Sequence, residues 1–114
     1  MAVEFSMNQA LELWRTTLVA SVRADGPDLS ARQMALLLIV YGEPPPHTVR
    51  GLAAKLNISK PAVTRALDTM GRLDFTRRKR DDTDGRNVLV QRTIKGSVFL
   101  SEFADLIKRR AARL

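Results

Sequence analysis

The chain contains no cysteine, which excludes disulfide bonds, thiolate metal sites and redox sensing by thiols. It also lacks a long apolar run, since the longest, Met34 to Tyr41, is far shorter than the roughly 20 residues that span a bilayer. The N-terminal segment carries Glu4 and Glu12 where a secretion signal would carry lysine or arginine. These absences favour a cytoplasmic protein.

The motifs of common enzyme classes are missing too. There is no nucleophile elbow, P-loop, zinc-binding HExxH segment or dinucleotide-binding glycine pattern. The single histidine, His47, follows three prolines without a nearby partner, so we expect a solvated loop residue. The acidic run that begins at Asp81 lacks the ligand spacing and closing glutamate of a calcium-binding EF-hand loop. The sequence therefore predicts no enzyme, no cofactor and no metal site.

Positive charge is abundant, and it is concentrated in the second half of the chain. Of 114 residues, 19 are basic and 12 acidic, which gives a formal net charge of +7. Residues 1–49 carry three basic and five acidic side chains, whereas residues 50–114 carry sixteen and seven. The length predicts one domain over residues 1–114, and the charge favours a polyanionic partner for its second half.

Three helices are predicted in the first half. Apolar residues of segment 4–23 recur at helical spacing and form one wide stripe, which suggests burial on two sides. The members of this stripe are Met7, Leu11, Trp14, Leu18 and Val22, and Leu13 and Ala20 widen it. Ser30 and Thr48 are the expected N-caps of the second and third helices, and Asn57 can adopt the left-handed conformation that ends the third.

The segment NISKPAVTRALDTMGRL, residues 57–73, predicts a fourth helix with a well-defined start. Ser59 is the expected N-cap, and Pro61 lies in the first turn, where its missing N–H would have no partner inside the helix. The residues expected to face the core are Val63, Leu67 and Met70. The residues left on the outer face are Lys60, Thr64, Arg65 and Asp68.

After Leu73 the apolar period changes from 3.6 to 2, which indicates strands. Residues 75–80 and 87–92 are extended runs joined by the turn-forming segment 81–86, so they predict a β-hairpin. A last helix begins at Thr93 or Ser97. This order predicts a mainly α fold with a small β-hairpin wing (α+β), a winged helix-turn-helix.

A helix with an uncovered outer face followed by a basic hairpin suits duplex DNA, because the major groove, about 12 Å wide, accepts one α-helix and displays the base edges. We expect Arg65 to read guanine. Asp68 could accept a hydrogen bond from cytosine, but an ion pair with Arg72, one turn later, is the simpler interpretation. Arg86 lies near the hairpin tip, where it can enter the adjacent minor groove, and Asp84 is expected to brace either this arginine or the turn.

The segment SKPAVTRALDTMGRLDFTRRKRDDTDGRNVLVQRTIKG, residues 59–96, resembles the recognition helix and wing of the MarR (multiple antibiotic resistance regulator) family of bacterial winged-helix repressors. The upstream segments SARQMALLLIVYG and TVRGLAAKLNISK are similar to that family's preceding helices, so the likeness covers residues 29–97. Its most specific marks are SKPAVTR and the Asp-x-Arg of the wing followed by NVLV. The resemblance implies a homodimeric transcriptional regulator, a repressor, that binds a pseudo-palindromic operator in the nucleoid.

The site residues follow from the resemblance and from the basic hairpin together. The predicted DNA-binding residues are Ser59, Lys60, Pro61, Thr64, Arg65, Arg78, Lys79, Arg80 and Arg86. The predicted dimer interface, from helices within 4–24 and 97–114, contains Trp14, Leu18, Phe103 and Ile107. The alternative function is a winged-helix module that binds protein or RNA without sequence-specific DNA binding.

The sequence also departs from the family pattern. Asp74 stands where the family usually has glycine after the recognition helix, and Arg92 stands where it usually has leucine. The 18 residues after Gly96 suffice for one helix, whereas the family usually has two, so we expect a smaller or rearranged dimer interface. A small-molecule effector stays open: Trp14, Phe99 and Phe103 could line its pocket, but apolar residues at helical spacing more often form core or dimer interface.

Overall fold

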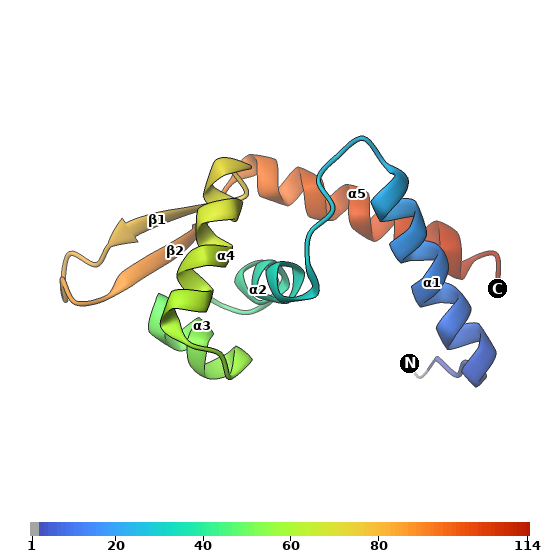
Figure 1. Cartoon of the computed structure of the whole chain (residues 1–114), viewed down its shortest axis with the longest axis horizontal. Helices are drawn as coiled ribbons and strands as arrows, with labels where there is room; N and C mark the ends of the chain where they lie inside the picture. Colours follow the sequence, from blue (N-terminus) through green and yellow to red (C-terminus); the bar gives the residue numbers. More distant parts are fainter. Residues whose placement is uncertain (1–2) are drawn as a thin grey trace. The chain divides into compact units, whose positions relative to one another are not determined.

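The computed structural model describes residues 3–114 and divides the chain into two compact units. Unit 1 comprises the chain up to Asp28 together with Leu100–Leu114, and unit 2 comprises Leu29–Phe99. Five helices and a two-stranded antiparallel sheet follow one another in the predicted order (Figure 1), which confirms the fold class. Within the described part of the chain, no helix is long and apolar enough to cross a membrane.

Unit 1 contains helix α1 (Met7–Arg23) and the C-terminal part of helix α5 (Ile94–Ala111). Helix α1 begins with a capping box, in which the Ser6 hydroxyl accepts the Gln9 N–H at 3.1 Å and the Gln9 side chain accepts the Ser6 N–H at 3.0 Å. Thr17 is the buried residue of this helix.

The apolar stripe predicted on α1 is present but uncovered. Its residues are between 41% and 75% exposed: Met7, Leu11, Trp14, Leu18 and Val22. The expectation that the stripe is buried on two sides is therefore wrong for a single chain. The reason is that the described part of unit 1 supplies a single further helical segment, the C-terminal part of α5, to pack against α1.

The helices of unit 2 are α2 (Ala31–Gly42), α3 (Val49–Leu56) and α4 (Lys60–Arg72). Their N-caps are Ser30, Thr48 and Ser59, each of which accepts a backbone N–H three residues ahead, so the three predicted caps are confirmed. Asn57 has φ 53° and ends α3 in the left-handed conformation, as predicted.

The core of unit 2 lies between these helices and the hairpin. Its buried side chains include Leu36, Leu37, Val40, Leu52, Val63, Leu67, Met70, Phe75 and Val90. The three core residues predicted on α4 are fully buried. Because burying one such side chain stabilises a fold by about 1.5–3 kcal/mol, this packing fixes which face of α4 points outward.

The hairpin consists of β1 (Thr76–Arg80) and β2 (Val88–Arg92), paired from Thr76 opposite Arg92 to Arg80 opposite Val88. Its second strand is also attached to the start of α3. Leu89 forms a β-bridge with Thr48, and the Val90 N–H donates to the His47 carbonyl at 2.8 Å. The base of the wing is therefore fixed to the helices, while β1 beyond Thr76 is exposed.

His47 is buried, with 6% of its surface exposed, so the expectation of a solvated loop residue is wrong. Its ring Nε2 lies 3.0 Å from the carbonyl oxygen of Glu43. The backbone pairing of residues 47 and 48 with β2 draws this segment against the sheet. The sequence does not predict this contact, because it joins positions more than 40 residues apart.

A hydrogen-bonded cluster joins the end of α2, the end of α4 and the start of α5. The Tyr41 hydroxyl donates to the Phe75 carbonyl at 2.7 Å and accepts the Thr93 N–H at 2.9 Å. The Thr93 hydroxyl donates to the Asp74 carbonyl at 2.7 Å and accepts the Gly96 N–H at 2.9 Å, so Thr93 caps α5. Of the two predicted starts, the structure therefore selects Thr93.

Candidate nucleic-acid interface

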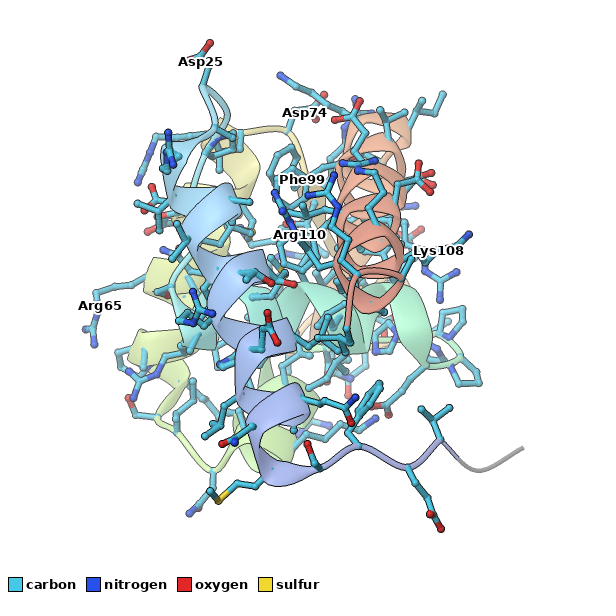
Figure 2. All side chains as sticks on the ribbon, turned by 90° about the vertical axis from the view of Figure 1, so that its right-hand side faces the viewer. Asp25, Arg65, Asp74, Phe99, Lys108 and Arg110 are labelled. Atoms are coloured by element: carbon cyan, nitrogen blue, oxygen red, sulfur yellow. The ribbon has the colours of Figure 1, made fainter. Side chains whose placement is uncertain are left out.

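The predicted reading residues of α4 lie together on its exposed side. This recognition face comprises Ser59, Lys60, Pro61, Thr64 and Arg65, all exposed. The Ser59 hydroxyl accepts the Ala62 N–H at 3.2 Å and so fixes the first turn, whose positive end lies beside Lys60. Figure 2 shows the Arg65 side chain extending from α4 into open space. Within residues 3–114, neither Lys60 nor Arg65 forms an ion pair.

Asp68 does not pair with Arg72, so the simpler interpretation of the sequence is wrong. The Asp68 carboxylate instead accepts from Nη2 of Arg78 on β1 at 2.6 Å, and Arg72 donates to the Thr69 hydroxyl at 3.1 Å. The hairpin places Arg78 closer to Asp68 than Arg72 is, although Arg72 lies on the same helix as Asp68. This bond joins α4 to the wing and orients a predicted DNA-binding arginine.

The other basic residues of the wing are also held by neighbours. Lys79 pairs with Asp82 at 3.6 Å, Arg77 with Asp74 at 3.4 Å, and Arg80 Nη1 donates to the Gly85 carbonyl at 3.0 Å. Exposed ion pairs of this kind contribute only about 0–1 kcal/mol. These cations can therefore exchange their protein partners for phosphate oxygens at little cost.

Arg86 is braced by Asp84, as predicted. Arg86 Nε lies 3.0 Å from Asp84 Oδ1, Nη2 lies 3.1 Å from Oδ2, and the Arg86 N–H donates to Oδ1 at 3.1 Å. The side-chain hydrogen bond from Arg86 is the main cause that lowers the pKa of Asp84 below 3.8, and the backbone hydrogen bond adds to it. The guanidinium is thus held at the hairpin tip with 85% of its side chain exposed.

We predict that the hairpin tip loses order only in acid. Because the pKa of Asp84 is lower in the folded chain, the Asp84–Arg86 pair stabilises the tip above pH 3.8, and that contribution disappears as pH falls through the lowered pKa. An NMR titration of the Asp84 carboxyl should therefore give a midpoint below 3.8. In Arg86→Gln the midpoint should move upward, and an unchanged midpoint would contradict the pairing.

Two further arginines were not predicted as site residues. Arg50 is exposed on α3, and its charge contributes, after the bonds from Arg86, to the lowered pKa of Asp84, so it lies near the wing. Arg92, which replaces the family's leucine, donates through Nε to the Val40 carbonyl at 2.8 Å and through Nη2 to the Glu43 carbonyl at 2.9 Å. Arg92 thus attaches β2 to the C-terminus of α2.

The residues predicted for the dimer interface belong to unit 1. Trp14 is 57% exposed, Leu18 41% and Ile107 36%, and Phe103 is partly buried. Because these exposed apolar side chains recur at helical spacing, together they form a larger apolar surface than scattered single residues would.

The model of the MarR family matches residues 29–88, which is just over half of the chain. The match covers α2, α3, α4, β1 and the start of β2. The chain therefore belongs to the MarR family and has the fold of a MarR-type transcription regulator.

Solved structures give the same fold. BldR, a transcriptional regulator from Sulfolobus solfataricus, is 27% identical with a TM-score of 0.64, covering 90% of this chain and 74% of its own. The S. aureus MepR–DNA complex is 18% identical with a TM-score of 0.70, covering 90% and 78%. Streptococcus pneumoniae FabT in complex with DNA is 20% identical with a TM-score of 0.72, covering 94% and 73%. The comparison with curated proteins gives no match.

Proposed function

We propose that this protein is a sequence-specific DNA-binding repressor, without catalytic activity, that occupies operator DNA in the bacterial nucleoid. The recognition face enters the major groove, where Arg65 reads a guanine and Lys60 contacts phosphate. Arg86 enters the adjacent minor groove, and Arg78, Lys79 and Arg80 follow the sugar-phosphate backbone. MepR and FabT, which share the fold, are each solved in complex with DNA.

One observation carries this proposal. Lys60 and Arg65 form no ion pair with any described residue, whereas Asp68 on the same helix pairs with Arg78 of the wing. The buried residues Val63 and Leu67 fix the face of α4 that carries these two cations. A cation on this face that has no protein partner is available to an external anion. A module that binds protein would not need the first turn of α4 to be basic and uncovered.

Selection of duplexes from a random pool tests the proposal. A dimeric winged helix should enrich a pseudo-palindrome whose half-sites lie about 34 Å apart, one turn of duplex. If the protein neutralises Z phosphates of the duplex, the logarithm of the binding constant should fall with the logarithm of the salt concentration, with a slope of about −0.9Z. Failure to enrich any duplex, or equal competition by single-stranded RNA, would favour the alternative of a protein- or RNA-binding module.

We also propose that two copies associate through unit 1, by means of Trp14, Leu18, Phe103 and Ile107. A two-fold interface presents the same patch twice, so one substitution acts at two places. We predict a dimer at about 10 µM, and Leu18→Asp should weaken it about 100-fold or more, because a carboxylate would be buried without a partner. Sedimentation equilibrium measures this, and Ile94→Asp, at an 87% exposed position in unit 2, is the matched control.

A wild-type protein that sediments as a monomer at this concentration would contradict the dimer. Equal weakening by Leu18→Asp and Ile94→Asp would remove the assignment of the interface to unit 1.

A further inference from the structure

Unit 1 contains a cavity of about 480 Å³, and none of the residues that line it belongs to the recognition face. Three arginines line it, Arg15 and Arg23 from α1 and Arg110 from α5, and its apolar part comes from Val19, Ala20 and Ala24. The volume lies within the range of roughly 300–1,000 Å³ that is typical of small-molecule sites. We call it the arginine cavity.

The arginines of this cavity have no acidic partner in the described part of the chain. None of the three takes part in an ion pair, and no carboxylate is among the residues that line the cavity. The Nε of Arg110 is buried without a hydrogen-bond partner. Buried donors are almost always satisfied in native proteins, so Arg110 retains hydrogen-bonding capacity that the described chain does not use.

Figure 2 shows Arg110 on the side of α5 that faces α1, whereas Lys108 lies on the opposite side of α5. On α1, Arg15, Val19 and Arg23 follow one another at helical spacing, on a different face from the stripe that contains Trp14 and Leu18. The cavity therefore lies beside the apolar surface proposed for dimerisation, and Arg15 borders both.

We propose that the arginine cavity binds a small, multiply charged organic anion. Guanidinium groups bind carboxylate and phosphate oxygens in pairs, and three of them in one cavity match a ligand with two or three negative charges. A cavity lined by charges of one sign raises the local concentration of the opposite sign. The ligand is thus a phosphate ester or a di- or tricarboxylate whose carbon skeleton contacts Val19, Ala20 and Ala24.

The experiment is isothermal titration of the full chain with glycerol 3-phosphate, a phosphate ester, in one arm and citrate in the other, at constant ionic strength. We expect one ligand per chain, and the arm with the tighter binding identifies phosphate or carboxylate as the preferred group. Arg110→Gln should weaken binding about tenfold or more. Lys108→Gln removes the same charge from the outward side of α5 and should leave binding unchanged, as should Arg65→Ala on the recognition face.

Arg15 is exposed, so Arg15→Gln tests the site even if Arg110→Gln fails to fold, and it should also weaken binding. If Lys108→Gln and Arg110→Gln lowered the affinity for the anion equally, net charge alone would explain the effect, and the proposal would be overturned. Absence of binding to both ligands would also overturn the proposal. Loss of dimer in Arg110→Gln without anion binding would assign the cavity to a carboxylate of a second copy instead.

Discussion

Arg65→Ala is expected to reduce DNA affinity by roughly 1–3 kcal/mol, about 5- to 150-fold, with the loss concentrated at one base position. The side chain lies on the exposed side of α4 and has no ion-pair partner in the described chain, so its removal costs no internal contact. A guanidinium that forms two hydrogen bonds with guanine discriminates against other bases, and alanine cannot. Anisotropy titrations on the selected duplex and on its single-base variants measure the effect.

Lys79→Ala is the matched control, because it also removes one positive charge. Lys79 lies on β1, and its ion-pair partner among residues 3–114 is the exposed Asp82, so it should contact phosphate and not bases. Its loss should weaken all duplexes about equally and reduce the salt slope by about 0.9. If Arg65→Ala also weakened all sequences equally, Arg65 would be a phosphate contact and base reading would belong to another residue.

Gly96→Ala is expected to lower the free energy of unfolding by about 2–4 kcal/mol. A Cβ at this position would lie 2.0 Å from the Tyr41 hydroxyl and 2.4 Å from the Phe75 carbonyl oxygen. Neither atom can move away without breaking the bond of 2.7 Å between them. The methyl group therefore both overpacks the site and leaves buried polar groups unsatisfied. Urea denaturation measures the change.

Gly71→Ala provides the control for this prediction. Gly71 is also helical, but a Cβ there would meet nothing within 4 Å. Since alanine is the better helix former by about 1 kcal/mol, Gly71→Ala should leave stability unchanged or raise it slightly. If the two substitutions had equal effects, the close packing at Gly96 would not contribute to stability.

The local features of the fold could be predicted from the sequence. The caps at Ser30, Thr48 and Ser59 and the left-handed Asn57 depend on neighbours within three or four residues, so their signals lie in the sequence itself. The burial of His47 could not be predicted, since it results from pairing with β2.

The same distinction between local features and tertiary contacts applies to the candidate site. Helical periodicity places Arg65 on the outer face of α4, because Val63, Leu67 and Met70 must be buried. It cannot show that Asp68 prefers Arg78, ten residues away, over Arg72 on its own helix. The sequence does not predict the proximity of Arg50 to the wing either, since the tertiary fold is what brings α3 beside the hairpin.

The central claim, that α4 and the hairpin bind duplex DNA, is tested most directly by mapping amide chemical shifts of the labelled protein during titration with the selected duplex. The account predicts that the largest changes occur at residues 59–65 and in the hairpin around Arg86, with smaller changes across α1. Absence of any shift, or changes confined to α1 and the C-terminal part of α5, would contradict it.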